Sequence, residues 1–200
     1  MNLKRIKNRE AKHSINHAWI LFVIGGLTLT IGLWTIFAPQ AALISKYVIF
    51  ITSFIVLGIL HISYMITTRK DTFDWSWGGA IGTLSIIGGI ILAEKEAHLW
   101  DVLLMYIGLW AFTQFFIMIT TSFILRNRKF VNWIITLTIS IIGLTLSIVL
   151  MINPTSMQTF NQYILGGVFM TYAIPHLYYA IAINKVNLHS SIKNESNSIR

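Results

Sequence analysis

Long stretches without any charged residue constrain the fold of this 200-residue chain more than any other feature. Asp, Glu, Lys and Arg are all absent from residues 18–45, 47–68, 102–125 and 130–184. A helix needs about 20 apolar residues to cross the roughly 30 Å hydrocarbon layer of a membrane. The stretches are continuously apolar rather than alternating, which indicates membrane helices and not barrel strands. Charged residues make up only 11% of the chain. A soluble domain carries about 25%, so that class is excluded.

Six membrane-spanning helices fit these stretches. We expect an all-α membrane protein whose spans lie, to within a few residues, at 17–38, 46–68, 75–93, 100–125, 130–152 and 160–183. The longest run divides at Asn-Pro-Thr-Ser, residues 153–156, which is typical of a turn. The first run exceeds the roughly 7–15 apolar residues of a signal peptide, so we expect it to remain as a span. Residues 1–16 then form a basic segment, 17–184 the membrane domain and 185–200 a polar tail.

Basic residues lie almost entirely on one side of the predicted helices. Of the 15 Lys and Arg residues, all but Lys46 and Lys95 fall in the N-terminal segment, the second and fourth connections or the C-terminal tail. Because basic loops stay in the cytoplasm, we expect both termini to be cytoplasmic. The expected location of the protein is the cell (plasma) membrane. The net charge of +8 then reflects topology and attraction to anionic lipid, and not a nucleic-acid partner. The lipid bilayer is the expected partner; no protein partner is indicated, and a homo-oligomer stays open.

Small residues recur at one spacing in the first, third and fifth spans. The sets are Gly25, Thr28 and Gly32; Gly82, Ser85 and Gly89; and Ser140, Gly143 and Ser147. Each set follows the spacing i, i+3, i+7 of one helix face, and the sets are 57 and 58 residues apart. At the summed offset of 115, Pro39 matches Pro154, His61 matches His176 and Tyr64 matches Tyr179. The chain therefore reads as three tandem helical hairpins, at about 17–68, 75–125 and 130–184.

Successive hairpins enter the membrane with the same orientation, which predicts a pseudo-threefold bundle. Small residues let helices approach closely, so we expect the first, third and fifth spans near the axis. The expected packing residues are Gly25, Gly32, Gly82, Gly89, Ser140, Gly143 and Ser147. The other spans carry bulkier side chains, such as Phe115 and Phe116, and are expected further out toward lipid. The alternative interpretation of the small-residue faces is a narrow pathway lined by hydroxyl groups.

Two histidines lie within predicted spans. His61 is eight residues from Arg69 and His176 nine from Lys185, about 12 and 13.5 Å along a helix, so both are expected at similar depth in the cytoplasmic leaflet. A histidine titrates between about pH 5 and 8, and ionisable groups within spans are functional candidates. The alternative is a neutral imidazole bonded to a carbonyl or a neighbouring tyrosine. His61 and His176 are thus candidates for pH sensing or for simple polar contact.

Other polar features have weaker implications. Gln114 is expected to form an interhelical hydrogen bond. Pro175 is expected to kink the sixth span, either for packing or to expose a carbonyl. The acidic connection at 94–101, which includes His98, is either an external proton or divalent-cation contact or a solvated loop.

Nothing in the sequence indicates an enzyme, a metal site or a cofactor. Cysteine is absent, and the spacing H-E-x-x-H does not occur. Ser85 or Ser140 with His176 is formally a serine–histidine pair. Ser85 lies mid-helix, however, where its hydroxyl would bond the preceding carbonyl, and no Ser stands on an exposed turn beside oxyanion donors. No catalytic residue is therefore assigned.

The repeats resemble a known family. The segments "WILFVIGGLTLTIGLWTIFAP", "WSWGGAIGTLSIIGGIIL" and "WIITLTISIIGLTLSIVLMINP" share an early Trp, small residues and, in the first and third, a Pro near the outer end. They are similar to the HdeD-like group, short-repeat bacterial membrane proteins of which one is associated with acid resistance. The second repeat departs from this pattern, with "AEKEAHLWD" where the Pro is missing. The resemblance implies a non-enzymatic multi-pass protein in envelope or acid-stress tolerance. The alternative function is a small-solute or proton transporter or channel.

Overall fold

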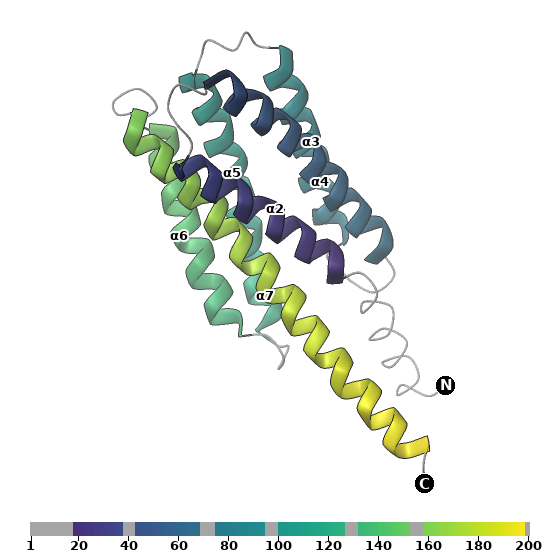
Figure 1. Ribbon diagram of the computed structural model, residues 1–200. Coiled ribbons are helices and arrows are strands. Elements are labelled where there is room, and N and C mark those ends of the chain that lie inside the picture. The colour runs from purple at the N-terminus through teal and green to yellow at the C-terminus, as the bar shows by residue number, and fades with distance from the viewer. Residues whose placement is uncertain are drawn as a thin grey trace.

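The chain is helical throughout the part that the structure describes (Figure 1). This computed structural model describes residues 18–37, 43–68, 75–94, 100–126, 132–152 and 158–198. The six helices are α2 (Ala18–Phe37), α3 (Leu43–Thr68), α4 (Trp75–Glu94), α5 (Trp100–Leu125), α6 (Trp133–Ile152) and α7 (Gln158–Ser198). The N-terminal segment and the connections on which the predicted orientation rests lie outside the described residues.

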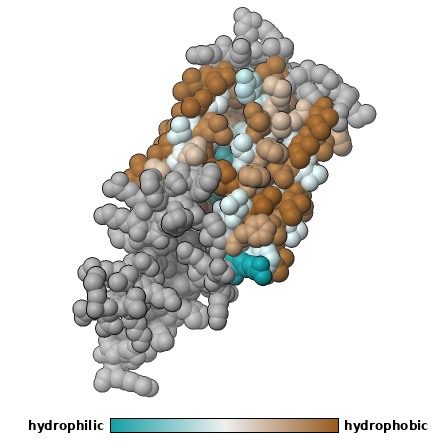
Figure 2. All heavy atoms as spheres, turned by 180° about the vertical axis from the view of Figure 1, so that it is seen from behind, coloured by the Kyte–Doolittle hydropathy of each residue, from teal (hydrophilic) through white to brown (hydrophobic). Residues whose placement is uncertain are grey.

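Five of the helices are long and apolar enough to cross a membrane. Their spans are Trp19–Phe37, Tyr47–Thr67, Val102–Phe123, Trp133–Ile152 and Phe160–Ala182. In α4 the apolar stretch Gly78–Ala93 is shorter. Large hydrophobic side chains such as Phe22, Phe116 and Phe123 are more than half exposed, and Figure 2 shows hydrophobic side chains spread over the described face. The prediction of an all-α chain with long apolar helices is confirmed, and these helices are compatible with a multi-pass membrane protein.

The helices pack most closely in three pairs. These are α2 with α7, α3 with α4, and α5 with α6. None of them is a pair within one predicted hairpin, since each joins the first helix of one hairpin to the second helix of another. The closest approach between two helices thus lies between the predicted hairpins.

The centre of the bundle is built by α3, α5 and α7. The large side chains buried there include Phe50 and Phe54 of α3, Trp110 and Phe115 of α5, and Phe169 and Tyr172 of α7. The expectation that the small-residue spans, now α2, α4 and α6, meet at the axis is wrong, because these helices make no extensive contact with one another. Phe115, expected near lipid, is fully buried, whereas Phe116 is 60% exposed as expected.

The physical reason lies in how side-chain size sets the distance between helices. A small residue brings one helix against one neighbour. Three helices around a common centre leave a space that only large side chains fill at the packing density of a protein interior. Small residues therefore mark helix pairs in this fold, and aromatic residues mark its axis.

Contacts between the three pairs are unequal. α6 packs well against α7, whereas α2 meets α3, and α4 meets α5, only sparsely. The pairs α2/α7 and α5/α6 consequently merge into one four-helix body, made of α2, α5, α6 and α7. The α3/α4 pair stands beside this body and has a sparse seam on each side.

The last helix is much longer than its span. The expected span ends near residue 183, but α7 continues to Ser198 over 41 residues. Pro175 lies inside this helix and does not end it. In Figure 1 the C-terminal part of α7 projects well beyond the bundle.

Candidate functional site

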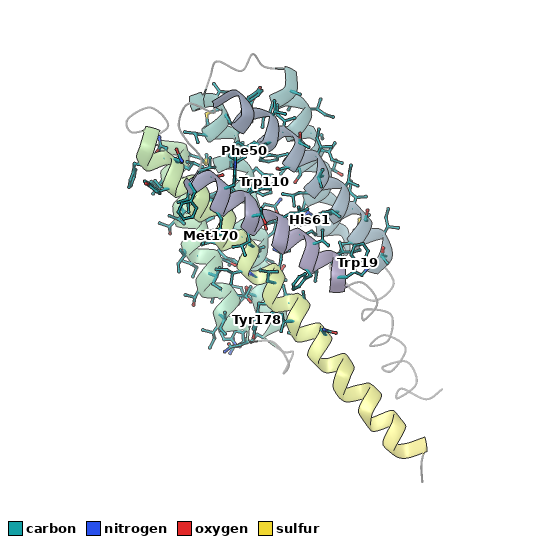
Figure 3. The ribbon with its side chains drawn as sticks, in the orientation of Figure 1. Trp19, Phe50, His61, Trp110, Met170 and Tyr178 are labelled. Atoms are coloured by element: carbon teal, nitrogen blue, oxygen red, sulfur yellow. The ribbon has the colours of Figure 1, made fainter. Side chains whose placement is uncertain are left out.

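The two histidines of the predicted spans meet at the centre of the bundle. His61 comes from α3 and His176 from α7, and both are buried. Their ring centroids are 5.8 Å apart, in an edge-to-face arrangement. Figure 3 shows Phe50, Trp110 and His61 one after another along the middle of the bundle. The fold therefore joins two ionisable residues that are 115 positions apart in the sequence.

Hydrogen bonds define the protonation pattern of the neutral His61 ring. Its Nδ1 lies 2.7 Å from the carbonyl oxygen of Leu57. A carbonyl can only accept, so Nδ1 carries a proton and donates it. In the neutral ring Nε2 is then an acceptor, and it lies 2.9 Å from the hydroxyl of Tyr172, which donates. His61 is thus held by its own helix on one side and by α7 on the other.

His176 is anchored in the same way. Its Nδ1 lies 2.9 Å from the carbonyl oxygen of Tyr172, one helical turn earlier, and donates to it. The bond from His61 to Leu57 is the equivalent contact at the offset of 115 residues. Tyr172 therefore touches both histidines, one through its hydroxyl and the other through its backbone.

Gln114 of α5 adds an amide to the same cluster. The hydroxyl of Tyr172 lies 3.4 Å from its Oε1. This long contact is the interhelical hydrogen bond that was expected for Gln114. Its Nε2 is buried and has no hydrogen-bond partner among the described residues. A buried donor without an acceptor is costly. The cluster of His61, Gln114, Tyr172 and His176, here called the central polar cluster, thus keeps one donor unused.

Aromatic rings enclose the central polar cluster. Trp110 lies 5.2 Å and Phe115 6.2 Å from the ring centroid of Tyr172. The indole nitrogen of Trp110 donates to the hydroxyl of Ser85 at 2.8 Å, which ties α5 to α4. No carboxylate and no Lys are present among the described side chains of the spans. A proton in the cluster would consequently have only neutral dipoles and rings around it.

The serines considered for catalysis bond within their own helices. Ser85 donates to the carbonyl of Ile81 at 2.9 Å, and Ser140 donates to the carbonyl of Thr136 at 2.7 Å. Within the described part of the chain, no group of three or more His, Asp or Glu side chains is arranged to hold a metal ion. The acidic connection around residues 95–99 lies outside the described residues.

The predicted packing residues sit at close contacts between paired helices. A Cβ added to Gly82 would lie 2.7 Å from the carbonyl oxygen of Gly58, and one added to Gly32 would lie 3.0 Å from that of Gly166. Gly25 faces Leu177, Gly89 faces Ile55, and Gly143 faces Phe115. Ser140 and Ser147 are fully buried on α6. All of these positions lie at contacts between helices, and Gly143 packs against Phe115 of the bundle centre.

Several contacts recur at the offsets of the sequence repeat. Gly25 meets Leu177 as Gly82 meets Ile62, and Gly32 meets Gly166 as Gly89 meets Ile51 and Ser147 meets Gly108. At the opposite end from the histidines, the hydroxyl of Tyr47 donates to the carbonyl of Leu92. The amide of Gln162 donates to the equivalent carbonyl, that of Thr35, at 2.6 Å. The same side-chain device therefore holds the last turns of α4 and α2.

Tyr172 is the member of the cluster that sequence reasoning missed. Its repeat equivalents are Leu57 and Gln114, so the repeat does not predict a tyrosine at this position. The available signal was its position four residues before His176, where side chain and backbone reach the same helix face. Comparisons with protein-family models, curated proteins and solved structures give no match, so the site is interpreted from this chain alone.

Proposed function

We propose that this chain is a non-enzymatic, six-span protein of the cell (plasma) membrane that acts in envelope or acid-stress tolerance, with His61 and His176 as its acid-responsive groups. Both termini are cytoplasmic in this proposal. The observation that carries it is the meeting of the two histidines at Tyr172, in the centre of an apolar bundle. The resemblance to HdeD-like repeats supports the physiological role.

The physical basis is the cost of placing a second charge in the cluster. Two protonated imidazoles 5.8 Å apart repel each other strongly where water is excluded. Histidine is also the side chain whose unperturbed titration falls between about pH 5 and 8. Protonation of both rings in acid would therefore destabilise the contact between α3 and α7.

We also propose that the three hairpins form a pseudo-threefold bundle. The recurrence of helix contacts at the offsets of 57 and 115 residues supports this arrangement. In it, the first helix of each hairpin packs against the second helix of another, and the second helices surround the axis. In this arrangement α4 also crosses the membrane, in addition to the other five helices, in spite of its shorter apolar stretch.

Acid survival of a deletion strain tests the role. A strain without this gene should survive an acid shock less well, and the wild-type gene should restore survival. Replacing both histidines by glutamine, His61→Gln with His176→Gln, should abolish the rescue at an unchanged protein level in the membrane. A control variant, Tyr163→Phe, alters an exposed residue of α7 and should rescue fully. Full rescue by the double variant would reduce the histidines to packing residues.

Cysteine labelling tests the topology, because the chain has no native cysteine. Single cysteines at Gln40, Ala97 and Ser156 should react with an impermeant reagent added outside intact cells. Cysteines at residue 128 and at both termini should react only after the cells are opened. External labelling at residue 128 would reverse the proposed orientation.

A small-solute or proton transporter or channel is the second candidate function. The unused Nε2 donor of Gln114 and the sparse seams beside the α3/α4 pair favour it, since a transport site needs a polar group that can be reached. Purified protein in liposomes should then dissipate a pH gradient or a solute gradient faster than empty liposomes. Equal rates with and without the protein would exclude proton flux.

A further inference from the structure

The α3/α4 pair is attached to the rest of the molecule differently from every other helix pair. Within the pair, the Cβ positions of Gly58 and Gly82 would each lie 2.7 Å from the other's carbonyl oxygen, so the two backbones are in direct contact. Toward α2 and α5 the pair has only sparse contacts. The pair is therefore tight inside and loosely joined outside.

Side chains in the bundle centre supply most of that attachment. Phe50 stacks on Phe169 with centroids 5.7 Å apart, and Phe54 meets Trp110 edge to face at 4.8 Å. The hydrogen bond between His61 and Tyr172 is the polar link from α3 to α7, and the bond from Trp110 to Ser85 is a second polar link, from α5 to α4. Ring contacts of this kind tolerate sliding, whereas a hydrogen bond has a fixed geometry.

The polar link from α3 to α7 depends on the protonation state of His61. When His61 is neutral, Tyr172 donates its hydroxyl proton to Nε2. When His61 takes up a proton, Nε2 becomes a donor, and the hydroxyl proton of Tyr172 must turn away. Gln114 Oε1 lies 3.4 Å from that hydroxyl and can accept it. One proton is thus accommodated, but a second one, on His176, places two positive rings face to edge across the α3–α7 contact.

The groups around His61 offer no counter-charge. From α7 it faces Tyr172 and His176, and the same helix α3 carries Tyr64 one turn away. α5 presents the neutral Gln114, and the described side chains of α2 and α4 include no titratable group. Opening of the α3–α7 contact would hydrate both rings and would give Gln114 Nε2 a partner.

We propose that α3 and α4 move as one rigid unit against the four-helix body, and that double protonation at His61 and His176 drives this movement. The moving unit follows from the helix contacts alone. Its control by protons rests on the proposed function. The movement exposes the central polar cluster along the two sparse seams.

Distance measurements between spin labels test the movement, since any introduced cysteine is the only reactive thiol. The test pair joins the α3/α4 pair to the body, with labels at Leu84 on α4 and Ile142 on α6. One control pair lies within the body, at Leu27 and Ile142, and the other within the α3/α4 pair, at Val56 and Leu84. All four side chains are at least 39% exposed, so labels fit. Pulsed electron paramagnetic resonance is recorded in lipid nanodiscs at about pH 7.5 and about pH 4, the second value lying below the range in which an exposed histidine titrates.

The expected result is a longer or broader distance for the test pair at the lower pH, with both control pairs unchanged. In the His61→Gln, His176→Gln variant the shift should disappear, with the control distances intact. A test pair as narrow as the controls at both pH values would overturn the moving unit. A test pair that is broad but independent of pH would overturn proton control. If the labels move with pH while the deletion strain survives acid normally, the proposed function fails and the movement stands.

Discussion

The pairs α2/α7 and α3/α4 are built alike but are joined to the molecule differently. In both, glycine backbones touch, at Gly32 with Gly166 and at Gly58 with Gly82. In both, a side chain donates across the pair to a carbonyl in the last turn of the partner helix, from α7 to α2 and from α3 to α4. Yet α2/α7 belongs to the four-helix body, whereas α3/α4 has a sparse seam on either side.

A second glycine distinguishes the two pairs. In α7, Gly166 faces α2, and the next residue, Gly167, faces α6, where an added Cβ would lie 3.4 Å from Leu146. The repeat-equivalent positions are Thr52 in α3 and Leu109 in α5, and both of these larger side chains are exposed. Among the described helices, only in α7 do two neighbouring glycines each face a different helix.

The largest expected effect tests whether the two pairs are equally tight inside. Gly32→Leu and Gly82→Leu should each lower the free energy of unfolding by up to about 3 kcal/mol, because the new side chain meets an opposing backbone. Gly26→Leu is the matched control, since a Cβ there meets nothing within 4 Å. Reversible unfolding in detergent micelles measures all three. A neutral Gly82→Leu variant would show that α3 and α4 are not in backbone contact.

The next effect concerns the hydrogen bond between His61 of α3 and Tyr172 of α7. Tyr172→Phe removes the donor to His61 Nε2 and should cost about 2 kcal/mol, the penalty of an unsatisfied buried acceptor. Tyr163→Phe, on an exposed position of the same helix, should be nearly neutral. The same unfolding measurement compares them. Equal stability of the two variants would mean that the α3/α4 pair is held by the aromatic rings and by the bond from Trp110 to Ser85.

A smaller effect is expected at the end of each pair remote from the histidines. Tyr47→Phe removes the hydrogen bond to Leu92, and Gln162→Leu removes those to Thr35 and Ile36, so each variant should cost about 1 kcal/mol. Hydrogen exchange at the last turns of α4 and α2 should rise in the corresponding variant only. Faster exchange in both turns from a single variant would show that the two ends are coupled.

The smallest effect separates the bundle centre from the lipid face. Phe115→Leu should cost about 1 kcal/mol because Phe115 is fully buried beside Tyr172. Phe116→Leu, one residue later and 60% exposed, should stay within about 0.5 kcal/mol of wild type. A reversed order would place the centre of the bundle elsewhere.

The spans could be predicted from sequence because length and absence of charge are properties of one segment at a time. The interior could not, because it depends on which helices become neighbours. The Gly25 and Gly82 stripes were interpreted as marking the axis, but small residues only state that one neighbour is close. The spacing of His61 and His176 from basic residues predicted a common depth in the membrane for the two rings. Only the packing of α3 beside α7 brings these rings together. Tyr172 acquires its role through that same packing.

Because α7 is one continuous helix, a rotation at the central polar cluster would also move the distant end of this helix. The helix that carries His176 extends another 22 residues to Ser198, about 33 Å at the rise of an α-helix. A rotation of about 10° between α3 and α7 at the cluster would therefore sweep the far end of this rod through about 6 Å. In the proposed movement, a change of hydrogen bonding at the central polar cluster would therefore displace the end of α7 by about this distance relative to α3.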